Sequence, residues 1–249
     1  MARNKRLRRD GPLPLILLVP NVVTMLGLCF GLTSIRFTFE NQFQFAAGLL
    51  ILAALFDGLD GLLARRLNAS SPFGAELDSL SDFVCFGVAP ALLIYNFGLR
   101  DFAGLGWLAA LFLAICCCLR LARFNVAAKD ESDDKGSFTG VPAPAGAMLA
   151  LFPVTLHLSG LVDLREVPAL IALWALIVGA LMIGRFKTIS LKAMRVSRDN
   201  AVYVLLAAAV VIGLMLTRIW AFHVGATFLY VSLLIWGVLK QRRDATPPT

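Results

Sequence analysis

Four aspartates stand close together in a part of the chain that is otherwise apolar enough to cross a bilayer. They are Asp57, Asp60, Asp78 and Asp82. A carboxylate at membrane depth costs roughly 2.5–3.5 kcal/mol on the insertion scale, so four without partners would cost on the order of 10 kcal/mol. We therefore expect a cation to lie among them.

Helical spacing would bring these carboxylates together from two neighbouring helices. Positions i, i+3, i+4 and i+7 of a helix share one face, as do positions i, i+4 and i+8. The first face carries Asp57, Asp60, Gly61 and Ala64, and the second carries Gly74, Asp78 and Asp82. Carboxylate oxygens suit magnesium, manganese or calcium better than zinc. The glycines would let a ligand approach the backbone.

The alternative is a pair of solvated helix faces, or acids neutralised by Arg65 and Arg66. Solvated faces do not need small residues on the same stripe, and both helices are otherwise apolar, so the sequence favours a metal site. Between the helices, Ser71 is placed to cap the second one and Pro72 to occupy its first position. A turn this short makes the two helices antiparallel neighbours.

The composition is that of an integral membrane protein. Of 249 residues, 59% are hydrophobic and 16% are charged, and the mean hydropathy of +0.79 exceeds what a soluble core requires. Runs of about 20 residues, the length of a membrane-spanning helix, predict an all-α polytopic membrane helix bundle of about eight transmembrane helices. Their ranges are 20–39, 43–66, 73–97, 102–124, 144–162, 166–184, 200–217 and 219–239. Almost no loop separates the last two at Arg218.

Lysines and arginines indicate the orientation. They gather before the first span, after the second, fourth and sixth, and at the chain end, whereas the other links hold Arg100, Arg165 and Arg218. The positive-inside rule then puts both termini in the cytosol. Asp57 would lie about 20 Å along its helix from the outer side, in the cytosolic half of a bacterial inner membrane. Topology and anionic lipid account for the net charge of +7 without nucleic-acid binding.

We expect a single domain over residues 1–249. A basic segment at 1–19 would lie at the cytosolic interface, and 240–249 would form a cytosolic tail. The consecutive cysteines at 116–118 point in different directions and do not make a zinc site. His157 and His223 are isolated in apolar spans, so the aspartates carry the strong chemical signal.

The aspartate pattern resembles the full signature of the CDP-alcohol phosphatidyltransferase family. It runs Asp57-x-x-Asp60-Gly61-x-x-Ala64-Arg65, eight residues, Gly74, three residues, Asp78, three residues and Asp82. Members of that family transfer a phosphatidyl or related group from a CDP-linked donor to an alcohol and release CMP. The resemblance implies a catalytic core of six helices, open to the cytosol and usually homodimeric.

The resemblance also implies roles for individual residues. The four aspartates would hold the Mg²⁺ or Mn²⁺ that binds the CDP pyrophosphate, and Asp82 would also act as the general base. The residues that would bind the CDP donor are Asn21, Thr24, Asp57, Gly61, Ala64, Arg65 and Gly74. Asn21 and Thr24 are equally suited to joining helices through hydrogen bonds.

Three further stretches resemble the phosphatidylserine synthase branch of the family: 20–24 (PNVVT), 119–125 (LRLARFN) and 137–145 (SFTGVPAPA). This resemblance covers about residues 20–147 and implies transfer from CDP-diacylglycerol to L-serine, giving phosphatidylserine and CMP. An arginine suits the serine carboxylate. The candidates for serine binding are Arg120, Arg123, Ser137 and Pro142, and both arginines fit a cytosolic helix end equally well.

Two other functions stay open at this point. Within the family, the acceptor would be another alcohol such as glycerol 3-phosphate or inositol, and glycerol 3-phosphate calls for several basic residues beside the acids. Outside it, intramembrane aspartates occur in divalent-cation transporters. The acids cluster at one end of two adjacent helices instead of lining a path across the bilayer, and no inverted repeat is visible, which favours the enzyme.

Overall fold

Every regular element that the computed structural model describes is a helix. The described residues are 15–69, 71–102, 104–129, 140–184 and 217–244, together with six positions between 206 and 215. Within them, five helices are long and apolar enough to cross a membrane. They are Ile16–Phe39, Phe43–Arg66, Pro72–Leu99, Leu105–Ala127 and Ile219–Gly237. The chain is therefore a polytopic membrane protein, as its composition predicts.

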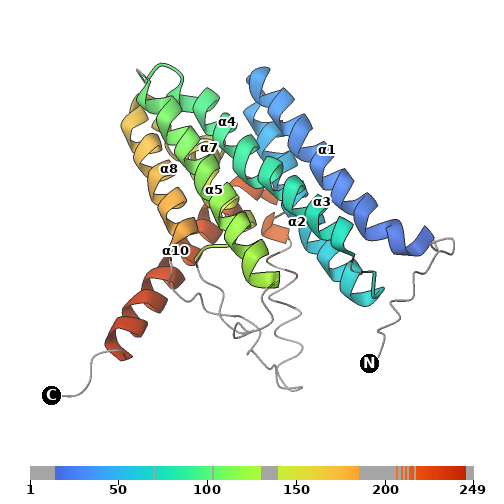
Figure 1. The fold of residues 1–249 in the computed structure, drawn as a ribbon. Coiled ribbons are helices and arrows are strands. Elements are labelled where there is room, and N and C mark those ends of the chain that lie inside the picture. The colour runs from blue at the N-terminus through green and yellow to red at the C-terminus, as the bar shows by residue number, and fades with distance from the viewer. Residues whose placement is uncertain are drawn as a thin grey trace, which may run out of the picture.

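The helices run up and down one bundle in chain order (Figure 1). A short turn, η1 (Leu15–Leu18), leads into α1 (Val19–Phe39), and α2 (Phe43–Arg66) returns beside it. The third span is made of α3 (Pro72–Asp82), η2 (Phe83–Val88), α4 (Ala89–Ile94) and η3 (Tyr95–Leu99). The remaining elements are α5 (Leu105–Lys129), α6 (Ala143–Ala150), α7 (Phe152–Leu158), η4 (Leu164–Glu166), α8 (Pro168–Ile183) and α10 (Ile219–Asp244).

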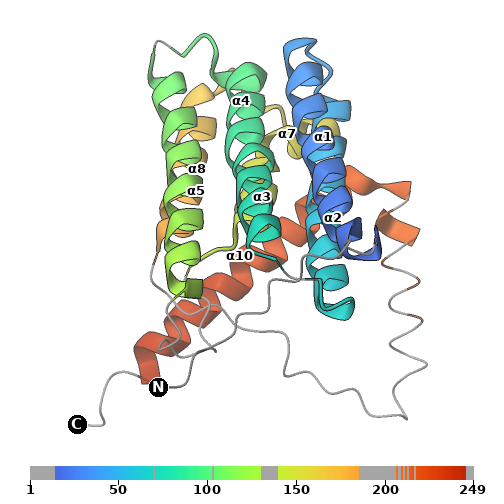
Figure 2. The ribbon, with the colours of Figure 1, turned by 45° about the vertical axis from the view of Figure 1, so that its right-hand side comes forward.

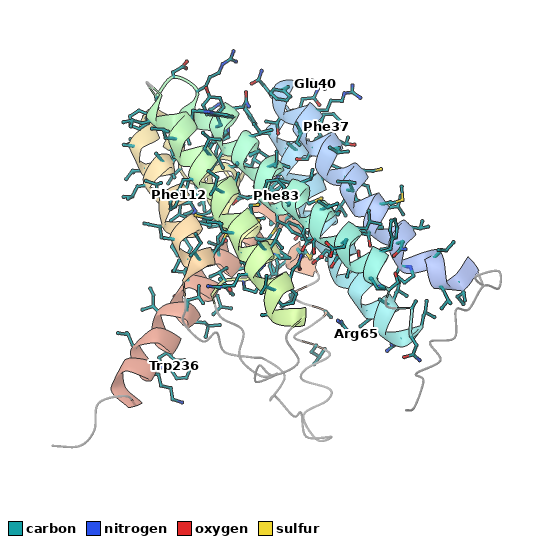
Figure 3. The ribbon with its side chains drawn as sticks, viewed as in Figure 1. Phe37, Glu40, Arg65, Phe83, Phe112 and Trp236 are labelled. Atoms are coloured by element: carbon teal, nitrogen blue, oxygen red, sulfur yellow. The ribbon has the colours of Figure 1, made fainter. Side chains whose placement is uncertain are left out.

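Glu40 and Arg65 mark the two ends of the bundle (Figure 3). The turns that hold Arg100 and Arg165 lie at the Glu40 end, whereas Arg123 lies toward the Arg65 end, where α5 finishes. Arg65 and Arg66 also lie at the Arg65 end, and Arg36 lies at the Glu40 end. The basic segments at 1–14 and 185–198 fall outside the described residues, so the orientation stays a prediction. Helices α5 and α8 lie side by side, and α10 crosses the bundle obliquely (Figure 2).

Five of the eight expected spans are confirmed among the described residues. The span expected at 144–162 consists of two short helices, α6 and α7. The span expected at 166–184 is α8, whose 16 residues reach about 24 Å, against a hydrocarbon core of about 30 Å. Most of 200–217 and all of 1–14 lie outside the described residues. Helical hydrogen bonds continue on both sides of Arg218. Arg218 N–H donates to the Leu214 carbonyl, and Phe222 N–H donates to the Arg218 carbonyl, each at 2.9 Å.

Two prolines, Pro90 and Pro153, lie where helices change form. Pro90 has no N–H to donate to the preceding turn. The backbone before it widens into the π-helix η2, in which Ala89 N–H donates to the Val84 carbonyl, five residues earlier. Pro153 likewise leaves the Leu149 carbonyl without its helical donor, close to the end of α6. The indole N–H of Trp174 in α8 donates to that carbonyl at 2.7 Å. A neighbouring helix thus satisfies the polar group that the break leaves free.

Small residues let α1 approach its neighbours closely. Gly31 has no room for a side chain, because a Cβ there would lie 2.5 Å from the Cys85 sulfur of η2. Ser34 Oγ donates to the Ala46 carbonyl of α2 at 2.8 Å, a type of contact worth about 0.6 kcal/mol in membranes. The same stripe of α1 continues to Thr24, which brings the helix against the aspartates.

Candidate functional site

The turn between α2 and α3 has the local structure expected from its sequence. Ser71 Oγ accepts a hydrogen bond from Gly74 N–H at 3.0 Å, and Pro72 is the first residue of α3. Asn68 adopts a left-handed φ of +50°, which asparagine tolerates better than most residues. Helix α1 packs against α2 and α3, so all three helices contribute to one site.

Three of the four aspartates form a group with the dimensions of a metal site. One carboxylate oxygen each from Asp57, Asp60 and Asp78 lies within 4.8 Å of the other two. Two oxygens bound to one Mg²⁺ or Ca²⁺ ion, each about 2.1–2.6 Å from it, lie no more than about 4.2–5.2 Å apart. The 4.8 Å limit falls within the span of one Ca²⁺ ion, and Mg²⁺ would require the oxygens to lie up to about 0.6 Å closer together. The cavity among the carboxylates holds about 10 Å³, room for one small ion or one water.

Asp82 lines the same cavity but stands beside this group of three. Its carboxyl group is within hydrogen-bonding reach of that of Asp57. The expectation that all four aspartates converge is therefore confirmed, while their separate roles stay predictions. A carboxylate in this position is placed to take a proton from a group that approaches the metal ligands.

Thr24 of α1 holds one of these carboxylates in place. Its Oγ1 donates to Asp60 Oδ2 at 2.6 Å, and the two residues are only 6% and 5% exposed. Hydrogen bonds that orient metal ligands commonly change metal affinity about 10- to 100-fold. The sequence predicts a contact between Thr24 and the nucleotide. The structure shows in addition that the Thr24 hydroxyl contacts Asp60.

A second cavity, of about 140 Å³, opens beside the aspartates between α1, α2 and α3. Its lining includes Asn21, Thr24, Gly61, Ala64 and Gly74, with Asp60 and Asp78 shared with the metal cavity. A Cβ on Gly74 would lie 2.8 Å from Asn21 Oδ1, so this glycine allows α3 to approach α1. Arg65 is exposed at the end of α2 (Figure 3), and its Nη1 would lie 3.6 Å from a Cβ on Gly61. Five of the seven residues expected to bind the donor thus line one cavity and Asp57 lines the adjoining metal cavity, whereas Arg65 is not among the residues that line either.

The two candidate arginines of α5 have different neighbours. Arg120 interacts electrostatically with Asp57 and Asp82. Its Nε is buried and makes no hydrogen bond with any described residue. Arg123 Nη1 donates to the Ile183 carbonyl at 3.0 Å, at the C-terminal end of α8. Arg120 is therefore placed to interact with Asp57 and Asp82.

Pro142 lies at the start of α6, against the same end of α8. Val141 N–H donates to a carbonyl of α8 at 3.2 Å. Gly140 has a φ of +80°, and a Cβ on it would lie 2.6 Å from the Gly184 carbonyl oxygen, so a side chain does not fit there. Among the described residues, those that line the two aspartate cavities do not include Pro142. Ser137 falls outside the described residues.

Two contacts near the site were not expected from the sequence. Asn125 Nδ2 of α5 donates to Ser79 Oγ of α3 at 3.0 Å, which ties the two helices together. Tyr230 of α10 lies close enough to Arg120 for the two side chains to interact electrostatically. Asn125 belongs to one of the stretches that resemble the phosphatidylserine synthase branch, but nothing in the sequence of α10 singles out Tyr230.

Residues 17–183 match the CDP-alcohol phosphatidyltransferase family over two thirds of the chain. The chain belongs to this family. The matched part begins in η1 and ends with the last residue of α8, so it contains the aspartates and both cavities. Helix α10 lies outside the part that defines the CDP-alcohol phosphatidyltransferases.

Several curated proteins are similar to this family member. A CDP-diacylglycerol–serine O-phosphatidyltransferase of Mycobacterium leprae is 45% identical over 144 residues, 57% of this chain and 48% of that protein. One of Methanocaldococcus jannaschii is 39% identical over 172 residues, 69% of this chain and 74% of that protein. An archaetidylserine synthase of Methanothermobacter thermautotrophicus is 39% identical over 132 residues, 52% of this chain and 54% of that protein. The chain spans about half the length of the mycobacterial relatives it matches.

Proposed function

We propose that this family member is a phosphatidylserine synthase, which transfers the phosphatidyl group of CDP-diacylglycerol to L-serine and releases CMP. The observation that carries the proposal is the group of Asp57, Asp60 and Asp78 at the edge of a cavity lined by small residues. Oxygen ligands for a divalent ion beside space for a nucleotide suit the transfer of a phosphorus-containing group. Serine as the acceptor is supported by the names of relatives at 39–46% identity.

The metal ion in this proposal is Mg²⁺ or Mn²⁺. Asp57, Asp60 and Asp78 would bind it through carboxylate oxygens, and Asp82 would complete the set. When bound, the ion neutralises charge on the pyrophosphate and on the departing CMP. Thr24 orients Asp60 before the ion arrives, through the hydrogen bond of 2.6 Å.

Asp82 is the general base in this proposal. The serine hydroxyl oxygen forms a bond to the phosphorus of the phosphatidyl group, while the bond from that phosphorus to the CMP oxygen breaks. The hydroxyl proton passes to Asp82, which lines the same cavity as the metal ligands and lies beside Asp57.

The cytidine part of the donor would occupy the cavity between α1, α2 and α3. Asn21 offers hydrogen bonds there, and Gly61, Ala64 and Gly74 leave space. Arg65, beside Gly61, supplies a positive charge near the phosphates. These assignments make the cavity specific for the nucleotide and leave the aspartates free for the pyrophosphate.

Arg120 is the residue that we assign to the serine carboxylate. Its buried Nε lacks an acceptor within the described part of the chain, and a ligand carboxylate would satisfy it. Arg123 and Pro142 would act less directly, by supporting the junction of α5, α6 and α8. A contact between serine and Ser137 stays a prediction from the sequence.

We further infer a single domain over residues 1–249. Its six-helix core would comprise α1, α2, the third span, α5, the pair α6–α7 and α8, with two C-terminal spans after it. Both termini and the aspartates would face the cytosol, in a bacterial inner membrane, because basic residues gather at the Arg65 end. A homodimer is proposed from the family resemblance alone.

Product analysis tests the proposal. Purified protein would be incubated with CDP-diacylglycerol, Mg²⁺ or Mn²⁺ and, in separate reactions, serine, glycerol 3-phosphate or inositol. We expect CMP and phosphatidylserine with serine, and no lipid product with the other two alcohols. Formation of a phospholipid from glycerol 3-phosphate or inositol, and not from serine, would identify that alcohol as the acceptor. Failure to release CMP with any of the three would refute the transferase and turn attention to cation transport, measured in liposomes.

A further inference from the structure

A polar pocket lies at the Glu40 end of the bundle, where the membrane spans finish (Figure 3). It has a volume of about 670 Å³, which is within the usual range of a ligand site. Its lining comes from the turn between α1 and α2 with the start of α2, from η3, and from α7 and η4. The polar residues that line it are Asn41, Gln42, Gln44, Asn96, His157 and Arg165.

The pocket is separate from the aspartate site. It shares no lining residue with either of the two aspartate cavities. Phe43, which lines the pocket, and Asp57 lie on the same helix, about 21 Å apart along its axis. A ligand in this pocket would therefore not touch the groups that we assign to the transfer reaction.

A closed ring of contacts holds one wall of the pocket in place. Nε and Nη2 of Arg165 donate to the Asp163 carboxylate at 2.6–3.0 Å, and His157 Nδ1 lies 3.2 Å from the same carboxylate. The guanidinium carbon of Arg165 and the centre of the His157 ring each lie 5.6 Å from the centre of the buried Phe97 ring. These contacts position Arg165 and His157 before a ligand arrives, which lowers the cost of binding.

The same contacts determine which atoms remain for a ligand. Asp163 accepts from Nε and Nη2 of Arg165, which leaves the two N–H groups of Nη1. In the neutral imidazole of His157, Nδ1–H donates to Asp163, which leaves Nε2 as an acceptor. Asn96 Nδ2 donates to the Leu92 carbonyl at 3.0 Å, which leaves Oδ1 as another acceptor. Within the described part of the chain, the lining includes no aspartate or glutamate. The pocket thus offers donors to a phosphate and acceptors to hydroxyl groups.

Aromatic residues put the pocket at the level of the lipid headgroups. Tyr95 directly precedes Asn96, and the centres of the Tyr95 and Trp107 rings lie 5.2 Å apart. Tyrosine and tryptophan are enriched where membrane spans meet the headgroups. Phe45, which lines the pocket, is 59% exposed, so its ring would contact acyl chains. The pocket is therefore open to the headgroup of a lipid in the surrounding bilayer.

We propose that this pocket binds the headgroup of a phospholipid that carries both a phosphate and hydroxyl groups, in the leaflet on the Glu40 side. Arg165 donates to the phosphate, while His157 and Asn96 accept from the hydroxyl groups and the amide of Gln44 completes the polar wall. The bound lipid joins the turn between α1 and α2 to α7 and η4, and it therefore stabilises the folded protein by mass action. The inference goes beyond the proposed function and does not depend on it.

Lipid binding to the purified protein tests the proposal. Protein stripped of lipid in detergent would be titrated with dioleoyl phosphatidylglycerol, whose headgroup carries a phosphate and hydroxyl groups. Native mass spectrometry would count the bound lipid, and thermal unfolding would follow its effect on Tm. We expect one tightly bound lipid per chain and a higher Tm. Dioleoyl phosphatidylcholine has the phosphate but no hydroxyl group, and we expect it to bind about tenfold more weakly. Equal affinities for the two lipids would overturn the proposal.

Two variants locate the bound lipid. Arg165→Gln removes the guanidinium, and Gln44→Ala removes an exposed amide without altering the buried core. We expect each to weaken phosphatidylglycerol binding about three- to tenfold, the scale of one hydrogen bond between groups that water also reaches. Arg100→Gln is the matched control, because Arg100 is exposed at the same end of the bundle and does not line the pocket. An equal loss in the control would assign the binding to general charge attraction and refute the pocket.

The remaining outcomes also decide the matter. If Arg165→Gln and Gln44→Ala both bind phosphatidylglycerol as the wild type does, the proposal fails, and if Arg165→Gln does not fold, Gln44→Ala decides alone. Glycerol 1-phosphate carries the same polar groups without acyl chains, so equally tight binding of it would make the ligand a soluble phosphate ester and refute the lipid. CMP release is measured separately, and its absence in the wild type would refute the proposed function without affecting the lipid titration.

Discussion

Replacement of Thr24 by valine removes one hydroxyl group from the site and changes little else. Valine has nearly the shape of threonine, so α1 should still pack against α2 and α3. The lost interaction is the hydrogen bond of 2.6 Å from Thr24 Oγ1 to Asp60 Oδ2, between two buried side chains. Asp60 then loses the donor that orients it toward the other metal ligands.

The size of the effect follows from the geometry. A hydrogen bond to a charged group is worth about 1.5–3 kcal/mol, or about 10- to 150-fold in an equilibrium constant. The Thr24 hydroxyl also lies 3.1 Å from the Pro20 carbonyl, so its single hydrogen is shared between two acceptors. Sharing favours the lower part of the range. We expect Thr24→Val to raise the Mg²⁺ concentration for half-maximal activity about ten- to thirtyfold.

Titration of CMP release against Mg²⁺, at saturating donor and serine, measures this shift. Thr24→Ser keeps the hydroxyl and should restore the wild-type Mg²⁺ dependence. Thr33→Val is the matched control, because Thr33 lies on the same helix and its Oγ1 donates to the Cys29 carbonyl at 2.6 Å, away from the site. An unchanged Mg²⁺ midpoint in Thr24→Val, or an equal shift in the control, would refute the reasoning.

Three further predictions concern the charged residues. Asp82→Asn should abolish turnover and spare donor binding, because an amide cannot accept the serine proton; more than about a tenth of wild-type kcat, or about 1.4 kcal/mol of barrier, would remove Asp82 from that role. Alanine at any of the three grouped aspartates should abolish metal-dependent donor binding, and unchanged affinity with metal present would contradict that ligand. Arg120→Lys should raise the KM for serine about ten- to a hundredfold while sparing the donor KM, and Arg123→Lys should not. The reverse order would reassign the serine carboxylate to Arg123.

The aspartate site could be predicted from the sequence because local rules determine it. Helical spacing alone puts Asp57 and Asp60 on one face, and Asp78 and Asp82 on another. The short turn, with Ser71 as its cap, then brings the two faces to the same end of the bundle. No long-range information is needed for this part of the fold.

The features that the sequence left undetermined depend on helices that are distant in the chain. Arg120 and Arg123 are three residues apart on one helix, and the end of α8 is what distinguishes their surroundings. Pro153 is visible in the sequence, but the break beside it needs Trp174 from α8 to satisfy the free carbonyl. Tyr230 approaches Arg120 from α10, which no periodicity of either helix indicates.

The π-helix η2 makes the third span two helices in series. An α-helix turns about 100° per residue, and a π-helix takes up extra residues in each turn. The six residues of η2 therefore set the angle between the aspartates of α3 and the buried residues of α4. Six residues of a π-helix turn through about the same angle as five residues of an α-helix, so deletion of one residue from 83–88 would restore α-helical geometry and leave the two halves aligned. The alignment of the acids with the buried residues of α4 is thus encoded in the length and hydrogen bonding of the backbone, and not in any side chain.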